Sequence, residues 1–332
     1  MTYEWTGEKL IETCHAFWTS SAINTAVELD VFTPLADSPL PLENLAAKME
    51  LPLRSLKILV RALVALGLLH DTPDGLALTD FSRTHLCRGE TGYVGHIISH
   101  FSHLQEGWAN LAHAVRKNVP TCDSSSHTES PERRESFLMG MVNMADMQAR
   151  ECVPQLPVQG RTHLLDLGGG PGGFTVQFCQ HYPRMQATLF DLPTTKPLAE
   201  KYIAKHNLQK RINFVGGNFM KDVLPLGFDV AWLSQILHGQ NPEDAASLVT
   251  KAAGSLDKGG LLLVHEFVIH DDFKDSVFPA LFGVNMLVNT VDGQSYTEKE
   301  LVDMLNNAGL TEIRRLDLNF PKGRAVLAGV KA

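Results

Sequence analysis

The sequence has few cysteines, and none of them has the spacing of a metal or redox motif. Its five cysteines are scattered over 332 residues without a C-x-x-C pair. They are Cys14, Cys87, Cys122, Cys152 and Cys179. This usage argues against a disulfide framework or a zinc finger and favours free thiols in a reducing compartment.

Long apolar runs and a surplus of basic residues are also absent. No run of eighteen apolar residues occurs, so no membrane span is expected. The first residues carry Glu4, Glu8 and Glu12 and lack the basic-then-apolar pattern of a signal peptide. A net charge of −8 argues against a general binder of nucleic acid or anionic membranes. We therefore expect a soluble, cytoplasmic protein with neither nucleic acid nor membrane among its partners.

The composition that remains is that of an ordinary globular protein with about two domains. Apolar residues make up 44% of the chain and charged residues 20%, which is enough to build hydrophobic cores. The pattern changes near residue 150. It predicts a mostly helical domain over residues 1–150 and an α/β domain over residues 151–332.

The first domain has the pattern of a winged helix. A helix is predicted over residues 8–29, a short one over 42–49, and another that opens at Pro52 and ends at Gly67. Apolar residues then flank the turn at 71–75, which indicates a hairpin. In a DNA-binding regulator, Arg54, Lys57 and Arg61 would contact phosphates. Residues 38–90 hold six basic and six acidic residues, so a solvated face is the favoured interpretation.

Two further helices are predicted, over residues 92–118 and 132–150, with a mobile loop over 119–135. On the first, His96, His100 and His103 share one face. They would either bind a metal or, as we favour, edge a pocket, because metal sites normally draw ligands from several elements. On the second, Phe137 and Met141 belong to an apolar face that either enters the core or walls a substrate pocket.

The second half alternates strands and helices, which predicts a mainly parallel, Rossmann-like sheet covered on both faces. No helix separates the last two strands, so one of them is expected to run antiparallel at an edge. The predicted strands cover residues 163–167, 186–191, 211–215, 228–233, 260–267, 311–318 and 324–330. The predicted helices cover residues 173–182, 196–206, 242–256, 275–289 and 297–308.

A dense glycine turn joins the first strand of this half to its helix. Gly168, Gly170 and Gly173 satisfy G-x-G-x-x-G, the dinucleotide signature, although a merely tight turn has the same letters. Glycine lets the backbone approach a ligand closely, and the helix start offers unpaired N–H groups. Asp191 follows twenty-three residues after Gly168, at the end of the next strand, where an acid would bind a ribose diol. Together these features predict a nucleoside-bearing ligand.

The other strand ends carry further candidates. After the third strand, Asn218 and Phe219 would hydrogen-bond and cover an adenine, although a plain turn explains them equally well. The fourth strand ends near Ser234, shortly before His238, which is placed to act as a base near neutral pH. The fifth ends in His265-Glu266, and a carboxylate close to His238 would orient its ring.

These motifs together resemble the S-adenosylmethionine-dependent O-methyltransferases of the plant caffeic-acid and acetylserotonin type, including their bacterial relatives. The resemblance covers nearly the whole chain. It implies a winged-helix-like dimerisation domain followed by a Rossmann-like class I methyltransferase domain with a mainly parallel seven-stranded sheet. The motifs are LLDLGGGPGGF at 164–174, FDLP at 190–193, GGNFM at 216–220, LSQILHGQNPEDA at 233–245, GGLLLVHEF at 259–267 and GQSYTEKEL at 293–301.

The resemblance also implies roles for individual residues. S-adenosylmethionine would be the cofactor and S-adenosylhomocysteine its product. The cofactor would be bound by Asp166, Gly168, Gly170, Gly172, Asp191, Leu192, Asn218, Phe219 and Ser234. His238 would be the catalytic base and Glu266 its supporting carboxylate. A small aromatic or quinone-like acceptor would lie against His100, Phe101, Phe137, Met141, Phe278, Phe282 and Met286. A homodimer through the N-terminal domain is implied, and no metal is required.

Three positions depart from the family pattern. Gly239 stands where an Asp usually follows the catalytic histidine, Asn218 replaces the adenine-side Asp, and Ser295 replaces a second supporting Glu. The favoured mechanism is a direct displacement in which the protein aligns nucleophile, carbon and sulfur. Alternatives are a C-methyltransferase or non-methylating relative on the same scaffold, a nicotinamide oxidoreductase, and a winged-helix ligand-sensing regulator.

Overall fold

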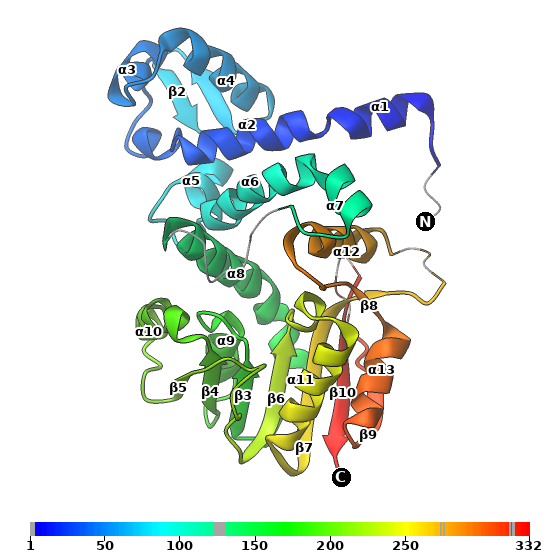
Figure 1. Cartoon of the computed structure of the whole chain (residues 1–332). Coiled ribbons are helices and arrows are strands. Elements are labelled where there is room, and N and C mark those ends of the chain that lie inside the picture. The colour runs from blue at the N-terminus through cyan, green and yellow to red at the C-terminus, as the bar shows by residue number, and fades with distance from the viewer. Residues whose placement is uncertain (1–3, 122–130, 273, 275, 319, 321–322) are drawn as a thin grey trace. The chain divides into compact units, whose positions relative to one another are not determined.

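The computed structural model describes residues 4–121, 131–272, 274, 276–318, 320 and 323–332. The chain forms two compact units, Met1–Gln105 and Glu106–Ala332, and each has its own hydrophobic core (Figure 1). The boundary lies closer to the N-terminus than the predicted one at residue 150. The helices between residues 106 and 150 therefore belong to the same unit as the sheet.

The first unit contains the expected helix, helix and hairpin. Its elements are α1 (Gly7–His15), α2 (Phe17–Glu28), η1 (Thr33–Leu35), α3 (Leu42–Lys48), α4 (Leu53–Ala65), β1 (Leu69–Thr72), β2 (Gly75–Leu78), α5 (Asp80–Leu86) and the start of α6 (Gly95–Ala109). The predicted helix 8–29 is divided at Ala16 into α1 and α2. Helix α5 was not predicted, although Thr79, whose side chain caps it by accepting from the Ser82 N–H, is a recognisable start signal.

Local sequence explains the winged-helix geometry. Helix α4 starts directly after Pro52 and buries Leu56, Val60 and Leu63, which recur at helical spacing. The hairpin closes where the Thr72 hydroxyl donates to the Gly75 carbonyl at 2.7 Å. Gly75 has φ +117°, and a Cβ there would come within 2.4 Å of the Leu40 backbone. Only glycine therefore fits this turn.

The second unit begins with helices that precede the sheet. Asn110 divides the predicted helix 92–118 into α6 and α7 (Leu111–Lys117). Helix α8 (Pro131–Cys152) is followed by η2 (Val153–Gln155). Most of the loop predicted at 119–135, and Cys122 with it, lies outside the described residues.

The central sheet follows the predicted strands closely. Its elements are β3 (His163–Leu167), α9 (Gly173–His181), β4 (Gln186–Asp191), η3 (Pro193–Thr195), α10 (Lys196–Lys205), β5 (Ile212–Gly216), β6 (Phe228–Ser234), η4 (Leu237–Gly239), α11 (Pro242–Gly254), β7 (Leu256–Ile269), α12 (Val277–Asn289), β8 (Tyr296–Thr297), α13 (Glu298–Asn307), β9 (Leu310–Arg315) and β10 (Arg324–Lys331). The strand order is β5-β4-β3-β6-β7-β10-β9, with the short β8 paired to β7.

One detail of the sheet prediction was wrong. The antiparallel strand is β10, and it lies between β7 and β9 instead of at the edge. Strand β9 occupies the edge, where its side chains are mostly exposed, whereas six consecutive residues of β10 are buried. The fully apolar stretch of β10 is the signal for an inner strand, because such a strand is covered on both faces.

The alternation of side chains divides the core into two layers. Trp232 and Leu263 pack with residues of α8 and α9 on one face of the sheet, and Leu233 and Val264 pack with residues of α11 and α13 on the other. The carboxyl ends of β3, β4, β5, β6 and β7 meet at one edge of the sheet, because these strands are parallel. All the candidate strand-end residues therefore come to that edge.

Candidate functional site

The glycine turn between β3 and α9 has the backbone that its sequence predicts. Gly168, Gly170 and Gly172 have φ values of +70°, +58° and +95°, which L side chains rarely adopt. Gly169 has an ordinary φ, but a Cβ there would lie 2.6 Å from the Asp166 carboxylate. Gly173 begins α9 directly against α8, where its Cβ would lie 2.5 Å from that of Ala145. The turn therefore needs glycine for its backbone angles and its close packing, and Gly170 alone among these five glycines has no described atom within 4 Å of a Cβ position.

Two carboxylates bracket this turn. Asp191, at the end of β4, accepts from the N–H of Gly170 at 2.8 Å and from the N–H of Leu192 and the hydroxyl of Thr195, each at 2.8 Å. Both of its oxygens therefore take part in fixing the glycine turn and the segment that follows β4.

Asp166 lies beneath the turn and is buried, with the Thr175 hydroxyl donating to it. Burial raises the pKa of Asp166 to about 7, the Thr175 hydrogen bond opposes this rise, and the charge of Asp191 adds to it. Asp166 therefore supports the turn from inside the protein, whereas Asp191 lies at its outer side.

The segment after β5 is a tight turn that contains a half-buried aromatic residue, Phe219. The Asn218 side-chain oxygen accepts from the Met220 N–H at 2.9 Å, and the Asn218 N–H donates to Asp222 at 2.8 Å. Phe219 lies near the glycine turn, since a Cβ built at Gly168 would be 3.4 Å from its ring. Lys251 holds the segment by donating to backbone carbonyls, including that of Asp222 at 2.8 Å. The turn interpretation of Asn218 thus holds for its side-chain oxygen.

His238 and Glu266 meet as the sequence predicts. The Nδ1 of His238, in η4, lies 2.8 Å from Oε2 of Glu266, and Oε1 of Glu266 accepts from the Leu237 N–H at 2.8 Å. The His238 side chain is 14% exposed and that of Glu266 2%. A carboxylate can only accept, so Nδ1 carries the hydrogen and Nε2 is left with the lone pair that accepts a proton.

Aromatic side chains line the neighbourhood of His238. The Phe282 ring, on α12, meets the His238 ring edge-on with centroids 4.7 Å apart. Phe267 lies 4.5 Å from Phe282 and 4.9 Å from Phe278 by ring centroids. Met286 is buried one turn further along α12. The second unit thus places an apolar aromatic surface beside the His238–Glu266 pair.

The remaining predicted pocket residues fall in two places. Phe137 and Met141 are half-buried on α8, in the second unit. His100 and Phe101 belong to the first unit, on α6, where Phe101 is exposed. Burial, and next the charge of His103, lowers the pKa of His100 to about 4. Among the described residues, no group of three or more His, Cys, Asp or Glu side chains has the arrangement of a metal site, the three histidines of α6 included.

The departures from the family pattern have clear surroundings. The Ser295 hydroxyl donates to the Pro279 carbonyl at 2.8 Å and so fixes the segment before β8 to α12. A Cβ built at Gly239 would meet no atom of the described residues within 4 Å. The Gln294 N–H donates to the His238 carbonyl at 2.8 Å, which holds η4 in place from the C-terminal side.

Sequence reasoning missed three residues around the site. Thr195 shares the Asp191 carboxylate, and Phe267 joins the aromatic surface. Gln235 has φ +59°, a strained value for a residue other than glycine, and sits between Ser234 and His238. The sequence around Gln235, L-S-Q-I-L, gives no signal of that strain. For Phe267 a signal exists, because the alternation of side chains along β7 assigns it to the same face as His265.

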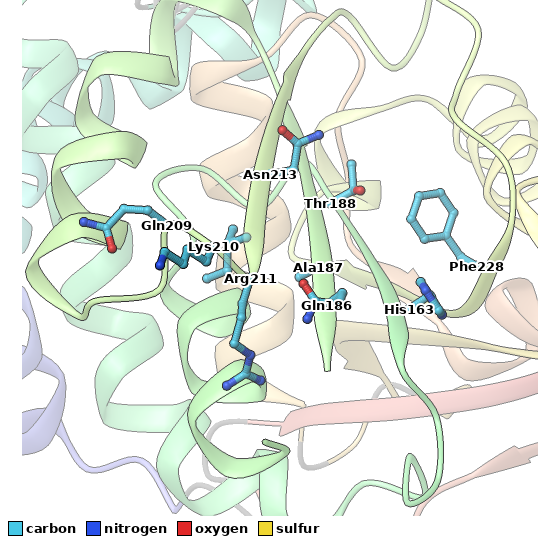
Figure 2. A pocket seen from close by; sticks show the side chains of 10 residues that line it. His163, Gln186, Ala187, Thr188, Gln209, Lys210, Arg211, Asn213 and Phe228 are labelled. Atoms are coloured by element: carbon cyan, nitrogen blue, oxygen red, sulfur yellow. The ribbon is translucent and has the colours of Figure 1, made fainter. Parts of the chain in front are cut away.

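A separate groove lies at the opposite end of the sheet. Figure 2 shows it lined by the first residues of parallel strands, His163 of β3 and Gln186 of β4 among them, together with Arg211. The Arg211 guanidinium already donates to the Tyr182 carbonyl at 2.7 Å. This groove is therefore distinct from the strand ends that carry the predicted residues.

The fold with its glycine turn and strand-end acid is the Rossmann-like fold of class I methyltransferases. The solved structure of human N-acetylserotonin methyltransferase in complex with SAM matches the fold with a TM-score of 0.88 at 23% identity, over 100% of this chain and 99% of that one. Residues 103–311 match the O-methyltransferase domain, and residues 11–88 match the O-methyltransferase dimerisation domain.

Sequence relatives agree with these matches. The 3-hydroxy-5-methyl-1-naphthoate 3-O-methyltransferase of Streptomyces sahachiroi is 30% identical, with 97% of this chain and 95% of the relative covered. The tetracenomycin polyketide synthesis 8-O-methyl transferase of Streptomyces glaucescens is 31% identical, with 96% and 95% covered. The chain therefore belongs to the O-methyltransferase family. It is an S-adenosylmethionine-dependent O-methyltransferase.

None of the helices in the described ranges has the length and hydropathy of a bilayer-spanning segment.

Proposed function

We propose that this enzyme methylates a hydroxyl group of a small aromatic acceptor, with His238 as the general base. The observation that carries the proposal is the 2.8 Å contact between His238 Nδ1 and Glu266 Oε2. Because this contact keeps the hydrogen on Nδ1, Nε2 is free to take the proton of an acceptor hydroxyl. Glu266 orients the ring and stabilises the imidazolium that forms.

We place the cofactor along the carboxyl edge of the sheet, across the ends of β5, β4, β3 and β6. S-adenosylmethionine supplies an electrophilic methyl group on a sulfonium when bound. We assign its methionine part to the backbone of Gly168, Gly170 and Gly172, which have positive φ values, and at Gly170 no described atom lies within 4 Å of the place a Cβ would take. Asp191 and Leu192 flank the ribose position, and Asn218 and Phe219 the adenine position. Ser234 completes the site from β6, and Asp166 supports it from beneath the glycine turn.

The acceptor is inferred to be a flat, hydroxylated ring system. Phe282, Phe267 and Phe278 form an apolar surface beside His238, and Met286 extends it along α12. Phe137 and Met141 are assigned to the same acceptor site. Such a surface favours an aromatic molecule whose one polar group reaches the base. The two Streptomyces relatives are named for a hydroxynaphthoate and for a polyketide, so we propose a phenolic acceptor of this polycyclic kind.

A methylation assay tests this function. Purified enzyme would be incubated with S-adenosylmethionine and a panel of hydroxynaphthoates and larger polycyclic phenols, and the products analysed by mass spectrometry. We expect a methyl ether that has lost its free hydroxyl, together with S-adenosylhomocysteine. A methylated product that keeps the free hydroxyl would instead establish a C-methyltransferase, and cofactor binding without any methylated product would overturn the proposal.

We also infer a homodimer through the first unit. Residues 4–14 are all exposed, and α1, α2 and the segment just before α1 present large apolar side chains to solvent. These are Trp5, Leu10, Ile11, Phe17 and Trp18, which are between 52% and 67% exposed. An apolar stretch of this kind normally marks an interface, and residues 11–88 match the family's dimerisation domain.

Light scattering after gel filtration tests the dimer. The wild type should elute as a dimer, and Ile11→Glu combined with Phe17→Glu should shift it towards the monomer, because charge is poorly tolerated in a buried interface. Glu43→Lys, on exposed helix α3, serves as a surface control. A wild type that remains monomeric at micromolar concentration would contradict the inference.

A further inference from the structure

Ser234 and His265 face each other across neighbouring strands at the carboxyl edge of the sheet. They are register partners in the parallel pairing of β6 with β7. The Ser234 Oγ lies 2.9 Å from Nδ1 of His265, within hydrogen-bond distance. Ser234 is half-buried, whereas His265 is fully buried. One partner can therefore reach a ligand at the edge, and the other can act only through it.

The surroundings of His265 keep its ring neutral. Trp232 stacks on the imidazole with centroids 5.4 Å apart at 22°, and Phe174 and Phe320 approach it at 5.6 Å and 5.4 Å. Burial, and next the positive charge of Arg324, lowers the pKa of His265 to about 3. The imidazole therefore carries a single hydrogen throughout the physiological range, on Nδ1 or on Nε2.

Two observations place that hydrogen on Nδ1. Nε2 is buried and has no hydrogen-bond partner among the described residues. A buried N–H without an acceptor is rarer in proteins than an acceptor left unsatisfied. Nδ1, by contrast, lies 2.9 Å from Ser234 Oγ, whose lone pairs can accept a hydrogen bond. His265 then donates through Nδ1, and Ser234 Oγ accepts.

We propose that His265 is a positioning residue that fixes the Ser234 hydroxyl as an acceptor, so that its O–H points to an acceptor group of the bound cofactor. Ser234 then has one donor for the ligand, and the amino-acid carboxylate of the cofactor is the strongest acceptor available to it. The inference rests on the proposed function, in which Ser234 belongs to the cofactor site. The neutral ring orients the hydroxyl without placing a positive charge beside a cationic sulfonium.

Consecutive residues of β7 thus serve two different parts of the site. His265 points to the face that carries Trp232 and positions Ser234, whereas Glu266 points to the opposite face and contacts His238. This follows from the alternation of side chains along a strand.

A double-mutant cycle tests the coupling by S-adenosylhomocysteine affinity, measured by isothermal titration calorimetry. Ser234→Ala and His265→Leu should each weaken binding about tenfold, the value of one oriented hydrogen bond. The double variant should bind no more weakly than Ser234→Ala alone, because His265 acts through that hydroxyl. His265→Asn, which can donate from nearly the same position as Nδ1, should restore affinity to within about threefold of wild type. Independent effects that multiply to about a hundredfold would show that His265 acts by packing and would overturn the proposal.

Nitrogen NMR of the wild-type enzyme provides a second test that needs no variant. With ¹⁵N-labelled histidine, His265 should show a hydrogen on Nδ1 that is unchanged between pH 5 and pH 8. A hydrogen on Nε2 would reverse the hydrogen bond and overturn the proposal even if the variants fail to fold. A wild type that does not bind S-adenosylhomocysteine would instead contradict the proposed function itself.

Discussion

Two histidines at the same edge of the sheet have opposite environments. His238 lies on η4 with Nδ1 against the Glu266 carboxylate, and its side chain is 14% exposed. His265 is fully buried among aromatic rings, with a serine hydroxyl as its partner. The Glu266 carboxylate fixes Nδ1 of His238 as a hydrogen-bond donor, whereas burial keeps the His265 imidazole neutral. The same side chain is thus suited to proton transfer in one place and to fixed hydrogen bonding in the other.

The position of each residue in the fold explains the difference. His238 is in a short helical turn after β6, where the chain leaves the sheet, whereas His265 is inside a strand that is covered on both faces. Residues that follow strand ends reach ligands, and residues inside strands support them. The predictions below test this division, beginning with the largest effect.

Replacement of His238 should have the largest consequence. In His238→Ala, turnover should fall about a hundredfold or more, because the group that takes the acceptor proton is lost. The affinity for S-adenosylhomocysteine should stay near that of wild type, since His238 is assigned to the acceptor side. Steady-state kinetics and calorimetry check the two parts. Turnover that is unchanged would remove His238 from the mechanism.

Replacement of Glu266, the partner of His238, should have a smaller effect on turnover. Glu266 accepts with both oxygens, from His238 Nδ1 and from the Leu237 N–H. Glu266→Gln leaves one oxygen for two donors, so turnover should fall about tenfold or more with the base still present. The pH–rate profile should also change, because the orientation and charge of the imidazole are no longer supported. A profile and rate equal to those of wild type would contradict the assigned role of the pair.

The buried histidine should instead be visible in the pH dependence of stability. The folded-state pKa of His265, about 3, lies below the ordinary value of 6.5. Between these two pH values the unfolded state therefore binds more protons than the folded state. The contribution is fully present above pH 6.5 and is lost as the pH falls towards 3. Relative to His265→Leu, wild-type stability should decrease on acidification by up to about 1.4 kcal/mol per pH unit. Urea unfolding of both proteins between pH 7 and pH 4 measures the difference, and parallel curves would contradict the neutral-ring argument.

Asp166 offers a matched control of opposite sign. Its folded-state pKa of about 7 lies above the ordinary value of 3.8, so here the folded state binds more protons in between. Its contribution is fully present below pH 3.8 and is lost as the pH rises through 7. Asp166→Asn should therefore gain stability relative to wild type as the pH increases across this range. The same unfolding measurements check it.

Much of this arrangement was predictable from sequence, and the exceptions have physical causes. Hydrophobic alternation placed the strands of the second unit within a few residues, because buried parallel strands are continuous apolar runs. The position of β10 next to β7 was not predicted. The absence of a helix between β9 and β10 predicts that they pair with each other, but it does not say which of the two is the inner strand and which is the edge strand. The unit boundary was misplaced because α7 and α8 are helical like the first unit, although they pack with α12 and α9.

At the site, strand ends were predictable and tertiary partners were not. The meeting of His238 and Glu266 follows from the parallel order of β6 and β7 and the family pattern. The pairing of Ser234 with His265 depends on the exact register of the same two strands, which no local signal specifies. The strain at Gln235 likewise appears only in the folded backbone.

The smallest effect is expected at Gly239, a departure from the family pattern next to His238. Gly239 stands where relatives of the resembled type have an Asp, and a Cβ there would meet no described atom within 4 Å. Gly239→Asp should therefore fold as stably as wild type. Its carboxylate would lie in a half-buried turn where solvent screens it, so turnover should change by about threefold or less. An increase in turnover much larger than threefold would mean that Glu266 alone does not support the His238 imidazole sufficiently. It would contradict the role assigned to the His238–Glu266 pair. Gly239→Ala separates the effect of the charge from that of losing glycine.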